Sequence, residues 1–115
     1  MKKTLCFDLD NTLCSTYKKF YHRAKPKKEA IKLVNSLYDK GYYIKIFTGR
    51  YMGRSKDNIS KAYNIGYKFT NKQLLKWGVK YHKLILGKPS FDYFVDDKSY
   101  GFNSNWIKYF KKKFL

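Results

Sequence analysis

The chain has 115 residues, of which 26 are lysine or arginine and 8 are acidic, so its formal net charge is +18. This length allows one domain, and the 43% hydrophobic and 20% aromatic content excludes an intrinsically disordered chain. No apolar run reaches the roughly 20 residues that a membrane-spanning helix needs, and the polar start is not typical of a signal peptide. We therefore expect a single cytoplasmic domain over residues 1–115, with no membrane span.

The positive charge has two interpretations. Proteins that read nucleic acids often use arginine, whose planar guanidinium grips phosphates and base edges, whereas here the arginines are confined to Arg23, Arg50 and Arg54. A lysine excess is also what codon bias in an AT-rich genome produces. We favour an ordinary lysine-rich surface and keep open a surface that binds a polyanion or nucleic acid. In both cases the field around the protein attracts anions.

Strand-like and helix-like patterns alternate along the chain. Short apolar, aromatic or β-branched runs predict strands at Thr4–Leu9, Tyr42–Phe47, Leu84–Leu86 and Tyr93–Val95. Helical spacing or capping patterns predict helices at Lys27–Lys40, Ser55–Tyr63, Thr70–Trp77 and Asn103–Phe114. This alternation predicts an α/β fold, a doubly wound (Rossmann-like) parallel sheet of four or five strands.

Six residues that often carry chemistry are expected to have ordinary roles. Two cysteines in a cytosolic chain form no disulfide framework, so both are expected to be free thiols. The histidines lack the spacing of a metal site, and the tryptophans are expected to pack in the core. These residues are Cys6, Cys14, His22, His82, Trp77 and Trp106.

The acidic residues carry more information than the basic ones. Asp8 and Asp10 follow the first predicted strand, and Asp96 and Asp97 follow the last. A strongly basic protein that clusters its few carboxylates in this way is expected to hold a cation. In parallel sheets, ligands bind outside the carboxyl ends of the strands. Residues 48–50, after the second strand, and Lys88, after the third, are therefore expected at the same edge.

In chain order, these segments resemble the four motifs of the haloacid dehalogenase (HAD) superfamily of phosphatases and phosphotransferases. The first motif is Asp8-Leu9-Asp10-Asn11-Thr12 after an apolar strand, and the second is Thr48-Gly49-Arg50. The third is Gly87-Lys88-Pro89, and the fourth is Val95-Asp96-Asp97. The resemblance covers residues 2–99 and implies a HAD-like core.

The resemblance implies a role for each carboxylate. Asp8 would attack phosphorus and form an acyl phosphate, and Asp10 would protonate the leaving oxygen and later activate water. Mg²⁺ would take oxygens from Asp8 and Asp96 and the backbone carbonyl of Asp10, with Asp97 as an outer or alternate ligand. Members of the superfamily that keep the phosphoenzyme have Thr at the position of Asp10, so the Asp favours a phosphatase.

The remaining motif residues are expected to hold the phosphoryl group. The hydroxyl of Thr48, the amide of Gly49 and the ammonium of Lys88 would bind its oxygens as charge develops. Lys98 stays open as an alternative to Lys88. Arg50 and Asn11 are candidates for substrate contact, with a surface role equally open for Arg50.

The spacing of the motifs leaves no room for the cap domain that many relatives insert. The implied enzyme is a minimal, capless, Mg²⁺-dependent phosphatase with an open site, which suits a bulky substrate or closure by another copy in a homo-oligomer. The sequence around Lys88 and Asp96 also resembles small phosphatases of capsule and surface-polysaccharide synthesis. This resemblance implies a phosphorylated sugar or related precursor as substrate. The alternatives are a nucleic-acid end (3′-phosphate) phosphatase or nucleotidase, and an inactive basic binding module.

Overall fold

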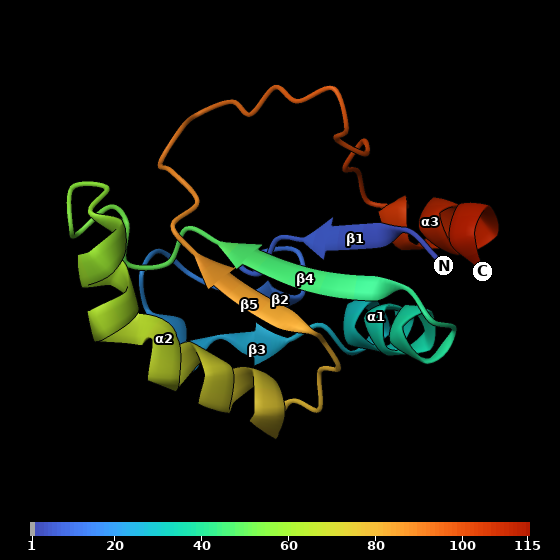
Figure 1. Ribbon diagram of the computed structural model, residues 1–115, viewed down its shortest axis with the longest axis horizontal. Helices are drawn as coiled ribbons and strands as arrows, with labels where there is room; N and C mark the ends of the chain where they lie inside the picture. Colours follow the sequence, from blue (N-terminus) through green and yellow to red (C-terminus); the bar gives the residue numbers. More distant parts are fainter. Residues whose placement is uncertain (1) are drawn as a thin grey trace.

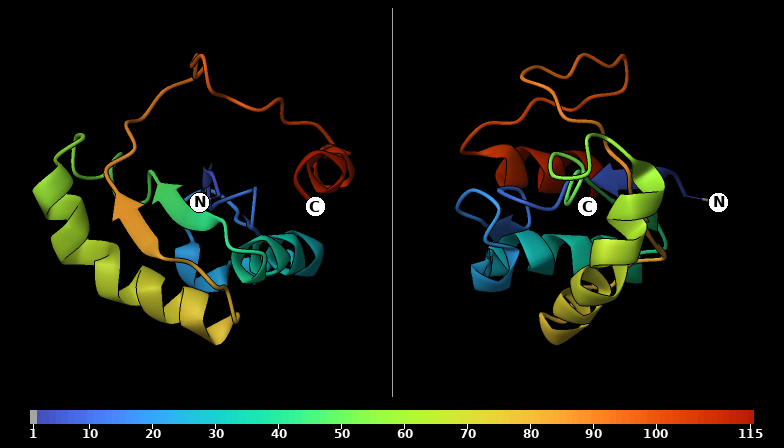
Figure 2. Two further views of the ribbon diagram at one scale, coloured as in Figure 1. Left: turned by 45° about the vertical axis from the view of Figure 1, so that its right-hand side comes forward. Right: turned by 90° about the vertical axis from the view of Figure 1, so that its left-hand side faces the viewer.

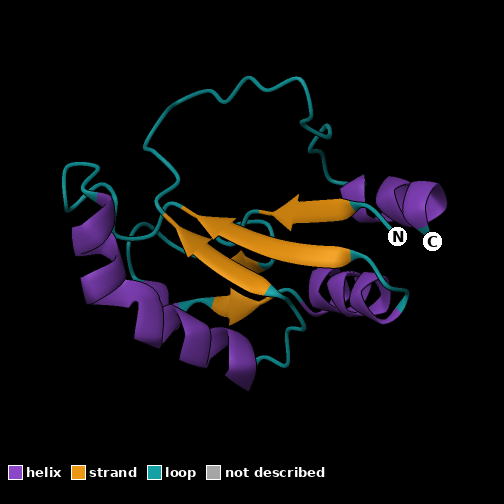
Figure 3. Ribbon diagram, in the orientation of Figure 1, coloured by secondary structure: helices purple, strands orange, loops and turns teal. Residues whose placement is uncertain are grey.

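The computed structural model describes residues 2–115. Its main sheet has three parallel strands, β1 (Thr4–Phe7), β4 (Tyr43–Thr48) and β5 (Lys83–Leu86), in the order β1-β4-β5 (Figures 1 and 3). An α/β fold with a parallel sheet is therefore confirmed. Three of the predicted strands lie within one or two residues of their expected bounds.

The sheet buries one of its faces. The register pairs Leu5 with Ile44 and Ile46 with Leu84, and all four side chains are buried because alternate residues of neighbouring strands point to the same side. On the opposite face the register pairs Cys6 with Lys45 and Lys45 with Lys83, and none of these three residues is buried.

Three helices accompany the sheet, α1 (Lys28–Asp39), α2 (Ile59–Lys76) and α3 (Trp106–Phe114). In the left view of Figure 2, α1 and α2 both lie below the strands. The doubly wound arrangement, with helices on both faces, is therefore corrected. The connections through α1 and α2 each move the chain to the next strand in the order β1-β4-β5. Two right-handed connections that advance in the same direction place their helices on the same face of the sheet.

Helix α2 replaces two predicted helices. Asn58 caps it by accepting the backbone N–H of Lys61, and the helix then runs unbroken through Thr70, where a new start had been predicted. Its buried residues recur every four positions, which is helical spacing without interruption. They are Ala62, Gly66, Thr70 and Leu74.

Gly66 lies where the helix meets the Tyr51 ring. A Cβ added at Gly66 would come within 2.0 Å of Tyr51 Cε2. Glycine is therefore favoured at this position because the Tyr51 ring approaches the helix backbone closely.

A small flap follows the first strand. Its two short strands, β2 (Cys14–Ser15) and β3 (Lys25–Pro26), pair antiparallel, and the 3-10 turn η1 (Tyr21–Arg23) lies between them. The flap is residues 14–26.

The predicted strand at Tyr93–Val95 is corrected to a loop, so the sheet has three strands rather than four or five. The segment from residue 87 to residue 105 arches away from the sheet between β5 and α3 (Figure 1). Within it, Tyr93 is 91% exposed and Val95 is 95% exposed. The rings of Phe91 and Phe94 stack with centroids 5.0 Å apart. Residues three apart on a strand point to opposite faces, so this stacking excludes an extended strand here.

Other expectations from the sequence are met. Both cysteines are free thiols, with Cys14 buried and Cys6 exposed. His82 accepts the backbone N–H of Ile44 and stacks on Tyr38, which is a packing role. Trp106 is buried in the core. Among residues 2–115, no helix is long and apolar enough to cross a membrane.

Candidate active site

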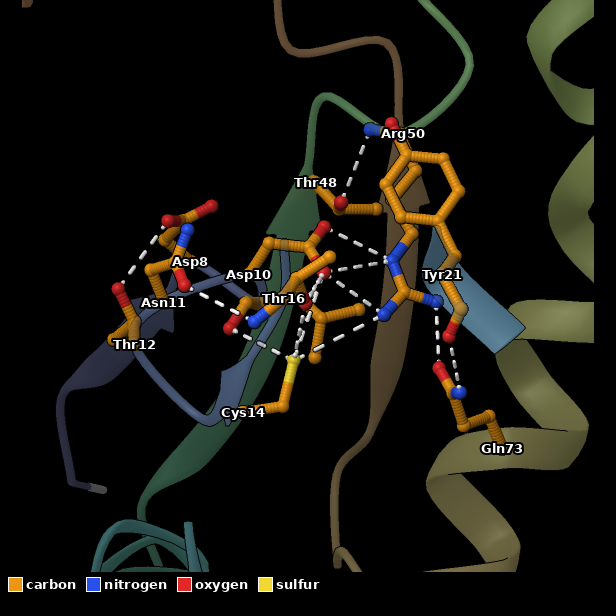
Figure 4. Close-up of polar contacts among 11 residues, drawn as sticks. Asp8, Asp10, Asn11, Thr12, Cys14, Thr16, Tyr21, Thr48, Arg50 and Gln73 are labelled. Carbon is orange, nitrogen blue, oxygen red and sulfur yellow. Dashed lines mark hydrogen bonds and ion pairs between the residues drawn. The ribbon is translucent and has the colours of Figure 1, made fainter. Parts of the chain in front are cut away.

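The first, second and third sequence motifs meet at the carboxyl edge of the sheet. Lys88 donates its backbone N–H to the carbonyl of Thr48, which ties the loop after β5 to the end of β4. A Cβ at Gly49 would lie 3.1 Å from the Lys88 carbonyl oxygen, so this close approach favours glycine. Figure 4 shows the Asp8 and Asp10 side chains pointing in different directions from the loop after β1.

A tight turn begins at Leu9, between the two carboxylates, and includes Asp10. Asn11 has a φ of 63°, and the carbonyl of Leu9 accepts the backbone N–H groups of both Thr12 and Leu13. Asparagine tolerates this left-handed conformation better than most residues. Asn11 also accepts the backbone N–H of Thr16 through Oδ1 at 3.1 Å, so its side chain ties this turn to the flap.

Asp8 is the accessible carboxylate of the pair. Its side chain is 38% exposed, and Lys88 Nζ lies 3.5 Å from Oδ1. Thr12 Oγ1 donates to Oδ2 at 3.2 Å. Asp8 therefore combines an open approach with a cation beside it. The Lys88 ammonium also lies over the rings of Phe91 and Phe94, at 5.5 and 5.4 Å from their centroids.

Asp10 has a different environment. Arg50 Nε donates to Oδ2 at 2.9 Å, and Arg50 Nη2 donates to Oδ1 at 2.9 Å, which is a two-pronged ion pair. Thr16 Oγ1 donates to Oδ1 at 2.6 Å. The carboxylate of Asp10 is thus held from two sides, by the strand-end residue Arg50 and by the flap.

Arg50 is not a substrate contact or a surface residue, and both interpretations from the sequence are corrected. Its side chain is fully buried. Nη1 donates to Gln73 Oε1 at 2.7 Å, and the guanidinium lies 4.7 Å from the centroid of the Tyr21 ring. A buried guanidinium needs partners for its donors and its charge, and Asp10, Gln73 and Tyr21 supply them.

Thr48 is fully buried at the end of β4. Its hydroxyl oxygen accepts the backbone N–H of Arg50 at 3.1 Å. A hydroxyl that accepts one bond keeps its own proton to donate. The predicted phosphate-binding residues lie together at the end of β4, where the Lys88 backbone contacts both Thr48 and Gly49. Thr48 itself is covered by its neighbours.

The fourth motif lies apart from the others. Asp96 and Asp97 are exposed in the arching segment, and Asp96 Oδ1 accepts the backbone N–H of Lys98 at 3.0 Å. This N–H, followed by the side chain of Asp97, lowers the pKa of Asp96. Within the described part of the chain, no three side chains of His, Cys, Asp or Glu are gathered to hold a metal. The predicted set of Asp8, Asp10 and Asp96 is therefore not assembled.

The sequence did not point to four of the residues around Asp10. Gln73 looked like part of a helix cap, yet it joins Arg50 to the carbonyl oxygen of Tyr21, to which Nε2 donates at 2.8 Å. Thr16 and Cys14 approach Asp10 from the flap, and burial raises the pKa of the Cys14 thiol. The only signal in the sequence was the placement of Arg50 directly after the Thr-Gly pair.

Comparisons with known proteins agree with the fold. No protein-family profile matches the chain, and no curated protein matches it. The crystal structure of an MCSG target from Vibrio cholerae is similar over 98% of both chains, with a TM-score of 0.78 and 28% identity.

Two structures of the Pnkp1/Rnl/Hen1 complex, an RNA repair complex, also contain a similar part. Their TM-scores are 0.57 and 0.55, at 19% and 17% identity, over 83% and 96% of this chain. The chain spans only 30% and 31% of the length of those chains. Likeness at this identity establishes the α/β fold alone.

Proposed function

We propose that this protein is a capless phosphomonoester hydrolase of the haloacid dehalogenase type, with Asp8 as its nucleophile. The observation that carries the proposal is the partly exposed Asp8 carboxylate at the carboxyl edge of a parallel sheet, with Lys88 Nζ 3.5 Å from it. The four motifs in chain order support the same assignment.

In the proposed reaction, a carboxylate oxygen of Asp8 attacks phosphorus and the ester P–O bond breaks. The leaving alkoxide takes a proton from Asp10, and an acyl phosphate forms on Asp8. A water molecule then attacks this acyl phosphate and gives its proton to Asp10, so that phosphate leaves and Asp8 is restored. The Lys88 ammonium offsets the charge that develops on the phosphoryl oxygens.

The contacts of Asp10 suit the second half of this cycle directly. All of its hydrogen bonds are accepted from donors on Arg50, Thr16 and Cys14, which is the arrangement of a carboxylate base. The acid half needs a proton on one oxygen. Oδ2 has a single donor, Arg50 Nε, and is the oxygen that can exchange this bond for a proton.

The proposed cofactor is Mg²⁺, which would neutralise charge between the nucleophile and the phosphoryl group when bound. The donors in question, the carboxylates of Asp8 and Asp96 and the carbonyl of Asp10, are all oxygens and fit a hard cation in kind. In position they do not complete a set, because Asp96 lies in the arching segment.

The test is a phosphatase assay with Mg²⁺ over phosphorylated sugars, nucleoside monophosphates and 3′-phosphorylated oligonucleotides. We expect turnover that vanishes with chelator, returns with Mg²⁺ more readily than with Ca²⁺, and is lost in Asp8→Asn. Full turnover in chelator would remove Mg²⁺ from the proposal. The absence of turnover on the whole panel would instead favour the inactive basic binding module.

A second candidate is a nucleic-acid end phosphatase, in place of the phosphorylated sugar or surface-polysaccharide precursor expected from the sequence. It is favoured by the net charge of +18 and by the fold likeness to parts of an RNA repair complex. The same panel separates the two by their relative kcat/KM values.

A further inference from the structure

A hollow of about 460 Å³ opens on the surface of the flap, next to the candidate active site. Its wall carries two aromatic rings, two cationic side chains and one polar side chain that reaches Asp10. These are Tyr17, Phe20, Arg23, Lys25 and Thr16.

The two rings are exposed and nearly parallel to each other. Tyr17 and Phe20 stack at 16° to each other with centroids 6.3 Å apart, and Tyr17 is 71% exposed. Large aromatic side chains normally bury most of their area. A pair that is left open in the wall of a hollow is therefore suited to stack against a planar ligand.

Cations surround these rings. The Arg23 guanidinium lies 5.6 Å from the Phe20 centroid, and Lys18 Nζ lies 5.4 Å from the Tyr17 centroid. Lys25 belongs to the same wall. Aromatic rings combined with guanidinium and ammonium groups are the combination with which proteins bind bases attached to phosphates.

Thr16 connects the hollow to Asp10, the proposed acid–base residue. This residue lines the hollow, and its hydroxyl donates to Asp10 Oδ1 at 2.6 Å. The adjacent ring, Tyr21, lies against the Arg50 guanidinium that holds the same carboxylate. A ligand in the hollow is therefore one residue away from the carboxylate that would receive a proton during hydrolysis.

We propose that the flap hollow binds the nucleobase of the substrate, with its phosphate directed to Asp8. The proposal rests on the proposed hydrolase function and narrows its substrate class to a phosphate ester that carries a nucleobase. A phosphorylated sugar offers no planar ring to stack on Tyr17. The base has two sources, a free nucleoside monophosphate or the end of a single strand.

The experiment measures binding by calorimetry to Asp8→Asn, which holds ligand without turnover. The probes are adenosine monophosphate, glycerol phosphate and a short 3′-phosphorylated oligonucleotide. Tyr17→Ala is expected to weaken adenosine monophosphate binding by about 10- to 100-fold, the usual range for one lost base–aromatic stack. It should leave glycerol phosphate binding unchanged, and Tyr17→Phe should restore the affinity.

The matched control is Tyr109→Ala, an exposed tyrosine on α3 outside the flap. Equal losses in Tyr17→Ala and Tyr109→Ala, or equal affinities for ligands with and without a base, would overturn the proposal. Tighter binding of the oligonucleotide than of the mononucleotide, with the same dependence on Tyr17, assigns the base to a strand end. The reverse order assigns it to a free nucleotide.

The two proposals fail in different ways. Binding of a base through Tyr17 without hydrolysis of any substrate would remove the hydrolase function and leave the base site standing. Hydrolysis that does not depend on a base would leave the hydrolase function standing and remove the base site.

Discussion

Arg50 grips the carboxylate of Asp10 with two nitrogens, although the two residues are 40 positions apart in the chain. Its third nitrogen, Nη1, donates to Gln73 on α2. One buried side chain thus connects the loop after β1, the end of β4 and α2. The orientation of the proposed acid–base residue is therefore set by the core of the protein as well as by its own loop.

Replacing Arg50 should destabilise the protein. Arg50→Met leaves the Asp10 carboxylate and the Gln73 amide without their buried partner, and we expect the free energy of unfolding to fall by about 3 kcal/mol, the lower end for a broken buried ion pair. Arg50→Lys keeps the charge but loses the two-pronged geometry, so its loss should be smaller. Chemical denaturation measures both. Arg54→Met, at an exposed position beside the same rings, is the control and should change stability little.

Substitution of Asp8 and substitution of Asp10 should block different steps of the proposed reaction. Asp8→Asn should abolish turnover because no acyl phosphate can form. Asp10→Asn should still form the phosphoenzyme from a substrate with a good leaving group, while hydrolysis of that intermediate slows by about 10²–10⁴-fold. Rapid quench with radiolabelled substrate follows the intermediate. Equal amounts of trapped phosphoenzyme in both variants would show that Asp8 is not the nucleophile.

Gly66→Ala should destabilise the protein although alanine is the better helix former. The new methyl group would overlap the Tyr51 ring at 2.0 Å, and overpacking of this kind costs about 1–3 kcal/mol. This exceeds the roughly 1 kcal/mol that alanine gains over glycine in a helix interior. Thermal unfolding measures the difference. Gly101→Ala is the control, because no atom lies within 4 Å of its added Cβ.

The response of binding to salt shows how the +18 charge is used. For a small phosphate ester the lysines act as a diffuse field, so affinity should decrease only modestly as salt screens it. For a polynucleotide, six or more phosphate contacts would lower affinity by about 10³ or more between roughly 50 and 200 mM salt. We expect the shallow response with nucleoside monophosphates. A steep slope with oligonucleotides, joined to removal of their 3′-phosphate, would make the strand end the main substrate.

Local sequence patterns predicted the helices and strands whose hydrophobic pattern is visible within a short stretch of sequence. Helix α1 and strands β1, β4 and β5 each show their periodicity within a short window, and the structure has them where the sequence indicates. Helix α2 was predicted as two helices because the residues from Thr70 to Gln73 have the spacing of a helix cap, whereas in the structure Thr70 lies on the buried face of one continuous helix. Hydrophobic periodicity does not reveal that Gly66 also lies on this buried face, because its small size is required by the Tyr51 ring, which is distant in the sequence.

The parts of the site that were mispredicted depend on distant partners. Arg50 was recognised as part of a motif, but nothing nearby in the sequence shows that Gln73 and Tyr21 enclose it. Tyr93–Val95 has the composition of a strand, yet composition does not supply a neighbour to pair with. The stacked rings of Phe91 and Phe94 provide a competing local contact, and the strand is absent.

In the sheet order β1-β4-β5, both β1 and β5 are edge strands. An open edge is a template for pairing with another chain, and lysines beside it are one common protection. Lys2 and Lys3 are exposed just before β1, and Lys83 is exposed at the start of β5. The surplus positive charge thus opposes aggregation, since two copies of this protein repel each other before their edge strands can pair. Concentrated salt shortens the range of that repulsion to about 3 Å at 1 M, so strand-to-strand association of separate molecules becomes more favourable under those conditions.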